Sequence, residues 1–325
     1  MSLIKEGKES VLITGGSGFI GTSLTKRLSS LGHKVYIWDI NHLQEECENV
    51  ELLQLDISHK DESLVDWIKE RNITKFVHLA AQTSTIVSNE DPNLDSRTNC
   101  LGIVNLMSYL RSLSKYHSNL KVVFSSSMTV YGNLNGGVVE TTLCNPVSLY
   151  GFSKIYSEQV IKYFSQFGID YSILRLFNVY GPGQDFKNIK QGMVSIYIAQ
   201  LLLNRHVDVT GSLKRYRDFI YIDDVVDALL LAITDKRTSS KTLNVGSGKL
   251  TCVIDLLNLI IKNIEKVSSY KYKFSERDGH VGDTFGIYNG SKEFVNLGFS
   301  PKNKLEDKMF DTIIAAKTQL GIVDL

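Results

Sequence analysis

Short runs of apolar residues alternate with amphipathic stretches along the first half of the chain. In Gly18–Leu31, apolar residues recur every three or four positions, a spacing typical of a helix that buries one face. Short apolar runs bounded by polar turns are typical of buried strands. The pattern predicts strands at Ser10–Thr14, Lys34–Trp38, Glu51–Leu55, Phe76–Leu79, Lys121–Phe124 and Tyr171–Leu176.

Helical patterns fill the intervals between these runs. Three further helices are predicted: one from about Asp61, one after Asp91-Pro92 and one at Leu149–Phe167. The proline at position 92 suits the first turn of the second of these helices. Strands that alternate with helices indicate βαβ units and a parallel sheet that is covered on both faces. We therefore predict an α/β fold with a doubly wound parallel sheet, whose ligands bind at the carboxyl ends of the strands.

After Asn178 the alternation becomes irregular. Helices are predicted at Gly192–Leu203, Ile222–Ile233 and Leu305–Leu320, and a strand near Thr242–Val245 is predicted to return to the main sheet. This half is predicted to form a second, smaller α+β lobe that binds substrate.

The composition is that of an ordinary globular protein. The chain has 325 residues, of which 43% are hydrophobic and 22% charged, enough for one large domain or two modest ones. A net charge of +1 favours neither nucleic acid nor an anionic membrane as a partner. The opening residues, MSLIKEGKES, lack the apolar core of a signal peptide, and no window approaches the ~18 apolar residues of a membrane span.

Cysteine and histidine lack the spacing of a metal site. The four cysteines, at positions 47, 100, 144 and 252, form no CxxC pair, and the seven histidines form no HxH or HExxH pattern. Isolated cysteines suit reduced thiols. The sequence therefore predicts a cytoplasmic protein without a bound metal.

A glycine-rich segment, TGGSGFIG at 14–21, links the first predicted strand to the first predicted helix. Gly15, Gly18 and Gly21 leave room for a tight turn and for a pyrophosphate to approach the backbone, while the helix N-terminus offers free N–H groups. Such a pattern is a weak signal by itself, but here the strand before it and the helix after it are both predicted. The segment therefore predicts a Rossmann-type dinucleotide site.

Asp39 ends the second predicted strand, where a carboxylate can bind the adenosine ribose hydroxyls and repel a 2′-phosphate. NAD is therefore predicted rather than NADP; the competing interpretation of Asp39 is a solvated loop acid. Asp56 and Ile57, after the third strand, either contact the adenine or form a strand-ending turn.

Tyr150 and Lys154 lie four residues apart at the start of a predicted helix, and so on one face of it. A free tyrosine has a pKa of about 10, and a nearby ammonium together with a cationic nicotinamide ring favours the phenolate. We predict that these charges lower the pKa of Tyr150 enough to make it a base at neutral pH. Tyr288 and Lys292 repeat the spacing, but the Asn-Gly turn signal between them indicates a chance match.

Three serines, at positions 125–127, follow the KVVF strand in the segment SSSMTVYG. A hydroxyl at the carboxyl end of a strand can hydrogen-bond the reacting oxygen of a substrate. The competing role, expected for one or two of the three, is to cap the end of the strand.

Together these segments resemble the extended short-chain dehydrogenase/reductase family, in its NAD-dependent epimerase/dehydratase group, and most nearly the UDP-galactose 4-epimerase-like enzymes. The resemblance covers nearly the whole chain, and the motifs occur in the family's order. They are TGGSGFIG at 14–21, Asp39, HLAAQ at 78–82, Asn99 in TNCLG, SSSMTVYG at 125–132, YGFSK at 150–154, RLFNVYGPGQ at 175–184 and RDFIYIDDVVDA at 217–228.

The resemblance implies a role for each matching residue. Tyr150 is the base, Lys154 is its partner and a ligand of the nicotinamide ribose, and Ser127 is the hydroxyl beside the C4 oxygen of a sugar. His78 is expected to be a packing residue rather than a ligand. The residues implied in NAD binding are Gly15, Gly18, Phe19, Ile20, Gly21, Asp39, Asp56, Ile57, Leu79, Ala80, Ala81, Asn99, Ser125, Tyr150 and Lys154.

The substrate implied by the resemblance is a nucleotide-sugar, with a UDP-sugar favoured. Asn178 matches a contact to its diphosphate and Arg217 an arginine on the nucleotide, with a surface cation as the competing interpretation of Arg217. Arg277, in the segment Arg277–Asp283, matches a second such arginine, although its distance from the following GSK segment is about two residues too long. Asn289 also stands where the family has Asp.

The resemblance also implies how the domains divide and how the chains assemble. The NAD-binding domain is predicted at 1–176 plus about 214–247, and the nucleotide-sugar-binding lobe at 177–213 and 248–325. A homodimer is implied, formed through the helices near 91–115 and 148–167.

The implied reaction is an inversion at C4 through a 4-keto sugar, with the hydride held by NAD between the two half-reactions. An NAD(P)H-dependent reductase of a nucleotide-linked 4-keto sugar uses the same residues, and a non-catalytic NAD-binding protein shares the fold, so both stay open. Met128 and Thr129 stand where the family's 4,6-dehydratases carry an Asp-Glu pair, and the Glu of the uronate decarboxylases is also missing. The sequence therefore argues against a dehydratase or a decarboxylase.

Overall fold

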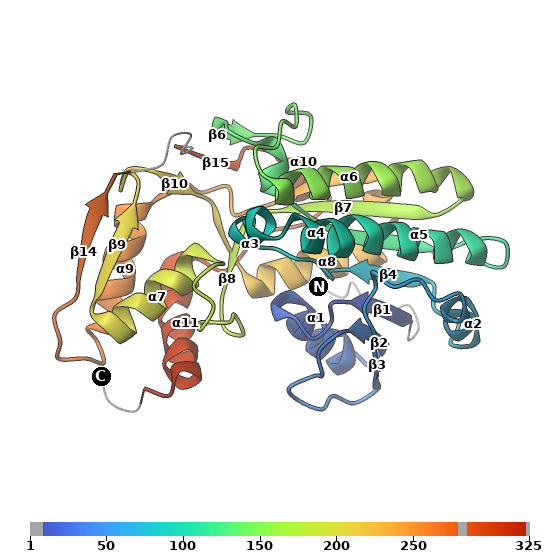
Figure 1. The fold of residues 1–325 in the computed structure, drawn as a ribbon, viewed down its shortest axis with the longest axis horizontal. Coiled ribbons are helices and arrows are strands. Elements are labelled where there is room, and N and C mark those ends of the chain that lie inside the picture. Colours follow the sequence, from blue (N-terminus) through green and yellow to red (C-terminus); the bar gives the residue numbers. More distant parts are fainter. Residues whose placement is uncertain (1–8, 279–284, 323–325) are drawn as a thin grey trace. The chain divides into compact units, whose positions relative to one another are not determined.

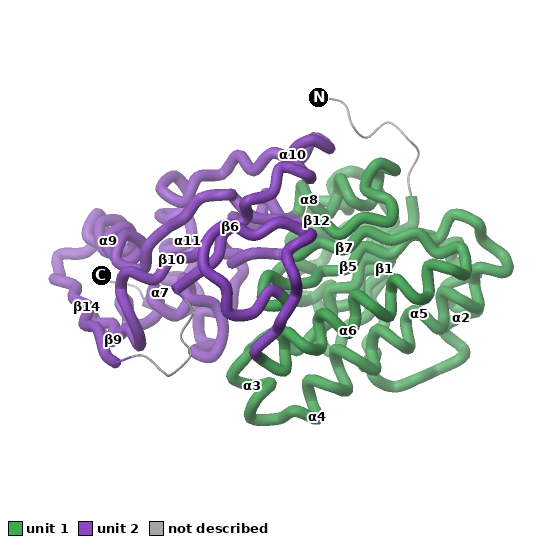
Figure 2. The backbone as a smooth tube through the Cα atoms, turned by 90° about the horizontal axis from the view of Figure 1, so that it is seen from above, with its two compact units in different colours: residues 1–130, 148–175, 226–243 green, residues 131–147, 176–225, 244–325 purple. Residues whose placement is uncertain are grey.

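The computed structural model describes residues 9–278 and 285–322, which divide into two compact units (Figure 2). Unit 1 consists of the residues up to Val130 together with Ser148–Arg175 and Val226–Leu243. Unit 2 consists of Tyr131–Val147, Leu176–Val225 and the residues from Asn244 onward. The chain crosses between the units several times, so neither is one continuous segment.

A seven-stranded sheet forms the centre of unit 1 (Figure 1). Its strands are β1 (Ser10–Thr14), β2 (Lys34–Asp39), β3 (Val50–Gln54), β4 (Lys75–His78), β5 (Lys121–Ser127), β7 (Asp170–Leu176) and β12 (Lys241–Val245). They lie in the order β12-β7-β5-β4-β1-β2-β3, and the pairs from β3 to β5 are parallel. The order reverses between β1 and β4, and such a switch point is where sheets of this kind bind ligands.

Helices cover both faces of this sheet, because successive strand residues point to opposite sides and both sides are apolar. Leu12 and Phe76 belong to one buried cluster, whereas Val11 and Ile13 are fully buried on the other face. The helices of unit 1 are α1 (Phe19–Ser30), α2 (Ser63–Glu70), α3 (Thr85–Glu90), α4 (Pro92–Asp95), α5 (Gly102–Leu113), α6 (Leu149–Phe164) and α8 (Ile222–Thr234), the last with its first turn in unit 2. Short 3₁₀ turns follow at Met128–Tyr131, Ser165–Phe167 and Lys236–Thr238.

The long helix predicted after Asp91 contains a break in its hydrogen-bond pattern. Asp91 caps it by accepting a hydrogen bond from the Leu94 N–H at 2.9 Å. A π-helical turn, Ser96–Leu101, then separates α4 from α5. Such turns are rare and occur most often at functional sites. This one holds Asn99.

Unit 2 is built from short strand pairs and from helices α7 (Met193–Asn204), α9 (Val253–Ile264) and α11 (Leu305–Leu320), which pack against one another. Its strands are β6 (Asn135–Val138), β8 (Asn178–Tyr180), β9 (His206–Thr210), β10 (Tyr216–Arg217), β11 (Phe219–Tyr221), β13 (Thr251–Cys252), β14 (Lys273–Arg277) and β15 (Gly286–Asn289), and α10 is Glu293–Asn296. The pairs β8–β11, β9–β14 and β6–β15 are parallel, and β10–β13 is antiparallel.

The predicted fold class is confirmed, and most predicted elements agree with the structure to within one or two residues. The strand near Thr242–Val245 joins the main sheet as β12. The domain boundaries differ from the compact units, since 131–147 and 214–225 cluster in unit 2. The reason is that β6 pairs with β15, and β10 with β13, all within that unit. Among the described residues, no helix has the length and apolarity needed to span a membrane.

Candidate active site

The glycine turn lies at the switch point of the sheet, where β1 and β4 end. Gly15 has φ +75°, in the left-handed region, and a Cβ built there would lie 2.5 Å from the backbone nitrogen of Ala80. At Gly21, a Cβ would lie 2.1 Å from the carbonyl oxygen of Gly15. Glycine at these two positions therefore permits the close approach of the turn to the end of β4 and to the start of α1.

The first turn of α1 offers backbone N–H groups to an anion. Gly18 is the N-cap residue, with extended backbone (φ −76°, ψ 178°) and no side chain to cover the helix end. Phe19 and Ile20 begin the helix, where N–H groups have no intrahelical acceptor and the helix dipole is positive. This geometry fits the pyrophosphate of a dinucleotide.

Asp39 is buried at the end of β2, beside the glycine turn. Its Oδ2 accepts a hydrogen bond from the Ser17 N–H at 2.9 Å, and its Oδ1 accepts one from the Asn41 N–H at 2.9 Å. Each carboxylate oxygen keeps acceptor capacity for a ribose hydroxyl. A fixed negative charge at this position opposes a 2′-phosphate, so the arrangement fits NAD.

Other residues predicted to contact NAD follow β3 and β4. Asp56 is exposed, and its Oδ1 accepts a hydrogen bond from the Ser58 N–H at 2.8 Å, which forms a strand-ending turn. Ile57 is buried in the core. Leu79 continues β4 by donating its N–H to the Thr14 carbonyl at 2.9 Å, and the partly buried Ala80 and Ala81 follow it. Their contacts to NAD stay predictions.

Helix α6 brings the predicted proton-transfer pair to the end of β5. Ser148 caps the helix by accepting a hydrogen bond from the Gly151 N–H at 3.1 Å. Tyr150 and Lys154 are then one turn apart, and both are buried. The Nζ of Lys154 donates to the backbone carbonyl of Ser125 at 2.9 Å and lies 5.7 Å from the centre of the Tyr150 ring.

The surroundings of Tyr150 hold its phenol in the neutral form. Burial raises the pKa of Tyr150 to about 12, a hydrogen bond from Ser127 lowers it, and the Asp95 carboxylate raises it. Among the protein's own side chains desolvation dominates, so the prediction that Lys154 and a bound nicotinamide together lower the pKa of Tyr150 stays a prediction.

Ser127 ends β5, and Thr129 orients its side chain. The backbone N–H and the hydroxyl of Thr129 both donate to Ser127 Oγ, at 3.2 and 3.0 Å. Because these donors occupy its acceptor positions, the Ser127 hydroxyl is free to donate its proton to Tyr150. The sequence identified Ser127 but assigned Thr129 no role.

The middle serine, Ser126, has a structural role. Its hydroxyl donates to Glu158 Oε1 at 2.5 Å, and Arg175 donates to both oxygens of Glu158 at 2.9 and 2.7 Å. The Glu158 side chain is 0% exposed and that of Arg175 is 4% exposed. This buried ion pair joins α6 to β7, and Glu158 lies one helical turn after Lys154 on α6.

Asn99 makes its side-chain hydrogen bonds within unit 1. Its Oδ1 accepts from the Gln82 N–H at 2.9 Å, and its Nδ2 lies 2.9 Å from the Gln82 carbonyl oxygen and 3.0 Å from Ser153 Oγ. It therefore holds the segment after Ala81 against α6. A direct contact between Asn99 and NAD stays a prediction.

His78 packs at the end of β4, as predicted. Its Nδ1 lies 2.6 Å from Thr14 Oγ1, and its ring stacks on Phe124 with 5.8 Å between ring centres. Burial, and then the charge of Lys154, lower the pKa of His78 to about 3. The imidazole is therefore neutral.

Two residues predicted to bind substrate come together in unit 2. Asn178 begins β8, and its backbone N–H and its Nδ2 donate to the carbonyl oxygen of Asp218 at 3.1 and 2.9 Å. Arg217 precedes Asp218 and donates to the carbonyl of Tyr216 at 2.7 Å. Asn178, the predicted diphosphate contact, and Arg217, the predicted arginine on the nucleotide, are thus joined through one peptide segment.

Asp218 organises this part of unit 2, although the sequence analysis assigned it no role. Its carboxylate accepts hydrogen bonds from the Ser247 N–H and hydroxyl, the Gly248 N–H and the Asn289 N–H, at 2.6–3.0 Å. Burial raises the pKa of Asp218, and these hydrogen bonds lower it. At Gly246, a Cβ would lie 2.6 Å from the same carboxylate. The RDF motif was the sequence signal that pointed to this aspartate.

Arg277 ends β14 and forms an ion pair with Asp208 on β9. Its side chain is 67% exposed. The rest of the predicted arginine motif, 279–283, lies outside the described residues. Binding of a diphosphate by Arg277 stays a prediction.

The second Tyr-Lys spacing places its residues differently from the first. Tyr288 lies on β15, and Lys292 follows that strand as the N-cap of α10. The two side chains therefore share no helical face, which confirms that the match is one of spacing alone.

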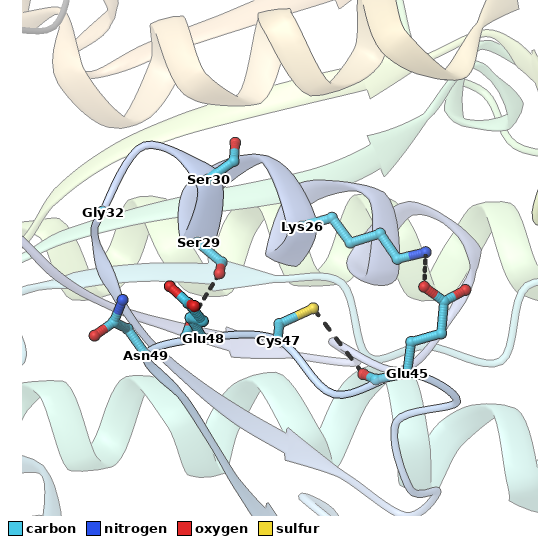
Figure 3. A pocket seen from close by; sticks show the side chains of 8 residues that line it. All are labelled: Lys26, Ser29, Ser30, Gly32, Glu45, Cys47, Glu48 and Asn49. Atoms are coloured by element: carbon cyan, nitrogen blue, oxygen red, sulfur yellow. Dashed lines mark hydrogen bonds and ion pairs between the residues drawn. The ribbon is translucent and has the colours of Figure 1, made fainter.

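A shallow hollow on unit 1 is separate from these residues (Figure 3). It lies between the second half of α1 and the segment before β3, and Lys26 and Glu45 form an ion pair at its edge, at 2.8 Å. None of the predicted site residues lines it. In the described part of the chain, no group of three or more His, Cys, Asp and Glu is placed to hold a metal ion.

Comparison with known proteins adds two kinds of finding. The family model described as "NAD dependent epimerase/dehydratase family" matches residues 11–246. A putative UDP-glucose 4-epimerase from Methanocaldococcus jannaschii is 35% identical over 303 residues, which cover 91% of this chain and 95% of that protein.

Solved structures share the fold over nearly the whole chain. The UDP-glucose 4-epimerase of Thermotoga maritima, solved with UDP-glucose, has a TM-score of 0.85 at 29% identity, over 96% of this chain and 99% of that one. The UDP-glucose 4-epimerase of Thermus thermophilus, solved with NAD, has a TM-score of 0.81 at 27% identity, over 95% and 99%.

Proposed function

The chain belongs to the NAD-dependent epimerase/dehydratase family, and from this premise we propose that it is a nucleotide-sugar 4-epimerase that inverts C4 of a UDP-hexose. The observation that carries the proposal is the arrangement of Ser127, Tyr150 and Lys154 at the carboxyl end of β5. A phenol, a hydroxyl and an ammonium beside a dinucleotide turn are the groups needed to move the proton of a secondary alcohol while its carbon loses hydride.

Each member of the trio has one task. Tyr150 takes the proton of the C4 hydroxyl, and Ser127 donates a hydrogen bond to the oxygens between which that proton moves. NAD, when bound, accepts the C4 hydride reversibly. Lys154, held by the Ser125 carbonyl, places its positive charge near the phenolate and binds the nicotinamide ribose. Tyr150 returns the proton once the 4-keto sugar has turned its other face.

The proposed NAD ligands all lie in unit 1. The glycine turn and the N-terminus of α1 bind the pyrophosphate, and Asp39 binds the adenosine ribose. The full proposed set is Gly15, Gly18, Phe19, Ile20, Gly21, Asp39, Asp56, Ile57, Leu79, Ala80, Ala81, Asn99, Ser125, Tyr150 and Lys154.

The substrate is anchored through its nucleotide, because the keto sugar has to turn before hydride returns. We assign this anchoring to Asn178, Arg217 and Arg277 of unit 2, whose donors suit a diphosphate. The UDP-glucose in the Thermotoga maritima enzyme supports UDP as the nucleotide.

The test is an NMR screen of UDP-, GDP- and dTDP-hexoses for inversion at C4. A UDP-hexose is expected to be inverted, and Tyr150→Phe is expected to slow the inversion roughly 10²–10⁴-fold, the usual contribution of a positioned acid–base group. Inversion that is unaffected by Tyr150→Phe would contradict the assignment of the base.

The cofactor content of the isolated protein and its cofactor consumption during the reaction separate the epimerase from a one-way 4-keto-sugar reductase. An epimerase regenerates its cofactor in every turnover, so bound NAD and no net cofactor consumption are expected. Stoichiometric consumption of NADH or NADPH replaces the proposal with the reductase. NAD binding without either activity leaves a non-catalytic NAD-binding protein.

We also propose a homodimer formed through α6 and the helical segment from α4 to α5. Leu149, Phe152, Tyr156 and Tyr163 are exposed along α6 at spacings of 3, 4 and 7 residues, which places them on one stripe of the helix. Leu94 and Leu101 are exposed seven residues apart on the neighbouring segment. A second copy of this chain covers such a stripe by helix–helix packing. Light scattering is expected to give a dimer, and Phe152→Lys with Tyr156→Lys a monomer.

A cytoplasmic location is proposed from the thiols. None of the four cysteines, all of which lie in the described residues, forms a disulfide, and each is partly exposed, which suits a reducing compartment. Cell fractionation tests this location.

A further inference from the structure

A buried carboxylate outside the proposed catalytic trio lies in unit 1. Asp95, the last residue of α4, is 2% exposed. Its Oδ1 accepts hydrogen bonds from Gln82 Nε2 at 3.1 Å, Ser88 Oγ at 2.7 Å and Asn99 Nδ2 at 3.1 Å. Three donors on one oxygen suit an ionised carboxylate. All three donors are neutral side chains.

The hydrogen bonds of this carboxylate lead to the helix that carries the catalytic pair. Asn99 Nδ2 lies within hydrogen-bond distance of both Asp95 and Ser153 Oγ, and Ser153 Oγ donates to the Tyr150 carbonyl at 3.0 Å. Ser157 Oγ donates to the Asn99 carbonyl at 3.1 Å. Ser153 and Ser157 flank Lys154 on α6, so the network fixes this helix against the π turn on both sides of the lysine.

The charge of Asp95 acts on both members of the pair. Burial lowers the pKa of Lys154 to about 8, and Asp95 and then Glu158 raise it. Asp95 also raises the pKa of Tyr150. The titratable and charged side chains around Lys154 are Asp95 on α4, Tyr150 and Glu158 on α6, Arg175 on β7 and the neutral His78 on β4.

Glu158 cannot replace Asp95 as the counter-charge of the lysine. Both of its oxygens are bound by the Arg175 guanidinium, which neutralises its charge locally. In the described part of the chain, Asp95 accepts hydrogen bonds only from neutral donors, which do not balance its negative charge. The positive charge with which it interacts is that of Lys154.

We propose that Asp95 is a positioning residue of the proton-transfer site, whose buried negative charge keeps Lys154 in the ammonium form and sets the pH range in which Tyr150 acts as a base. The inference rests on the proposed role of Tyr150 as the base. Because the same charge opposes the phenolate, Asp95 moves the working range to higher pH rather than raising the maximal rate.

The test is Asp95→Asn in the NAD-loaded protein, which keeps the shape of the side chain and removes its charge. Loss of the charge lowers the pKa of Tyr150, which sets the acid limb of kcat, and that of Lys154, which sets the alkaline limb. Both limbs are therefore expected to move to lower pH, by roughly one pH unit. Ser88→Ala is the matched control, because it removes one hydrogen bond of the network and keeps the charge. Its limbs are expected to stay in place.

A second readout needs no turnover. The ultraviolet absorbance of ionised tyrosine, with the signal of Tyr150→Phe subtracted, reports the titration of Tyr150 in the NAD-loaded protein, and Asp95→Asn is expected to move it to lower pH. Asp95→Ser removes the same charge with a smaller side chain and is expected to do the same. The proposal is overturned if the pH limbs and the tyrosine titration stay in place in folded Asp95→Asn or Asp95→Ser. It is also overturned if Ser88→Ala shifts them by the same amount. If the unsubstituted protein inverts no nucleotide-sugar, the proposed function fails, while the titration still tests Asp95.

Discussion

Ser127 Oγ accepts hydrogen bonds from both the backbone N–H and the hydroxyl of Thr129, at 3.2 and 3.0 Å. Because the two donors occupy acceptor positions of Ser127 Oγ, its own proton is available to Tyr150, whose pKa is lowered by interaction with Ser127. We therefore infer that Thr129, two positions beyond the serine, sets the direction of the proposed proton relay.

Thr129→Val is expected to lower kcat by about five- to tenfold, the effect of losing one net hydrogen bond of about 1 kcal/mol. The KM for the nucleotide-sugar is expected to change little, because Thr129 is not a proposed substrate ligand. Steady-state kinetics measure both kcat and KM. Thr129→Ser keeps the hydroxyl and serves as the control; equal losses in the two variants would show that packing, not the hydrogen bond, is responsible.

Ser127→Ala is expected to move the acid limb of the pH profile upward. The hydrogen bond from Ser127 lowers the pKa of Tyr150, so its removal raises that pKa, and the phenolate then forms only at higher pH. The profile of kcat against pH measures the shift. Its direction is opposite to that expected for Asp95→Asn, so the two variants test the electrostatic account as a pair. An acid limb that moves downward in Ser127→Ala would refute it.

Glu158→Gln is expected to destabilise the protein by about 3–5 kcal/mol, because it leaves the buried Arg175 guanidinium without its counter-charge. Replacing both partners, as in Glu158→Leu with Arg175→Met, is expected to cost less than the single change, since no charge is then buried. Urea unfolding of Glu158→Leu, of Arg175→Met and of the double variant measures this coupling. Strictly additive losses would mean that the ion pair contributes only through its separate side chains.

The long helices of both units could be predicted from sequence because their signals are local. Gly18–Leu31 and Leu305–Leu320 show helical periodicity over many residues, and α1 and α11 begin and end within one residue of these predictions. In contrast, β6 carries the sequence NGGV, which has the composition of a loop. It becomes a strand because Gly286–Asn289 pairs with it from a distant part of the chain. Such long-range pairing has no local signal, and it also explains why residues 131–147 cluster in unit 2.

The candidate site also has features that the sequence predicted and features that depend on the fold. Tyr150 and Lys154 were predicted from their spacing and Ser127 from the family resemblance, and the structure brings the three together. The direction of the pKa shift of Tyr150 was not predictable, because it depends on burial and on Asp95, which lies far away in sequence. Asp95 itself has no motif: an aspartate in a helical segment is most often solvated, and only the fold shows that this one is buried.

Gly15 and Gly18 are expected to respond differently to substitution by alanine, although both belong to the same glycine motif. At Gly15, alanine would have to adopt φ +75° and would place its Cβ 2.5 Å from the Ala80 nitrogen, so Gly15→Ala is expected to destabilise unit 1 by more than about 1 kcal/mol. At Gly18, φ is −76° and the nearest atom to a Cβ lies at 3.4 Å, so the change in stability is expected to stay within about 1 kcal/mol.

The effect of Gly18→Ala is expected to appear in NAD binding instead. A methyl group at the N-cap of α1 lies where the backbone offers its N–H groups to the pyrophosphate, so the affinity for NAD is expected to fall at least about tenfold, or about 1.4 kcal/mol. Urea unfolding and calorimetric titration with NAD separate the two effects. A Gly18→Ala protein with normal stability and normal NAD affinity would contradict binding of the dinucleotide at this turn, because the added methyl group would then meet no ligand.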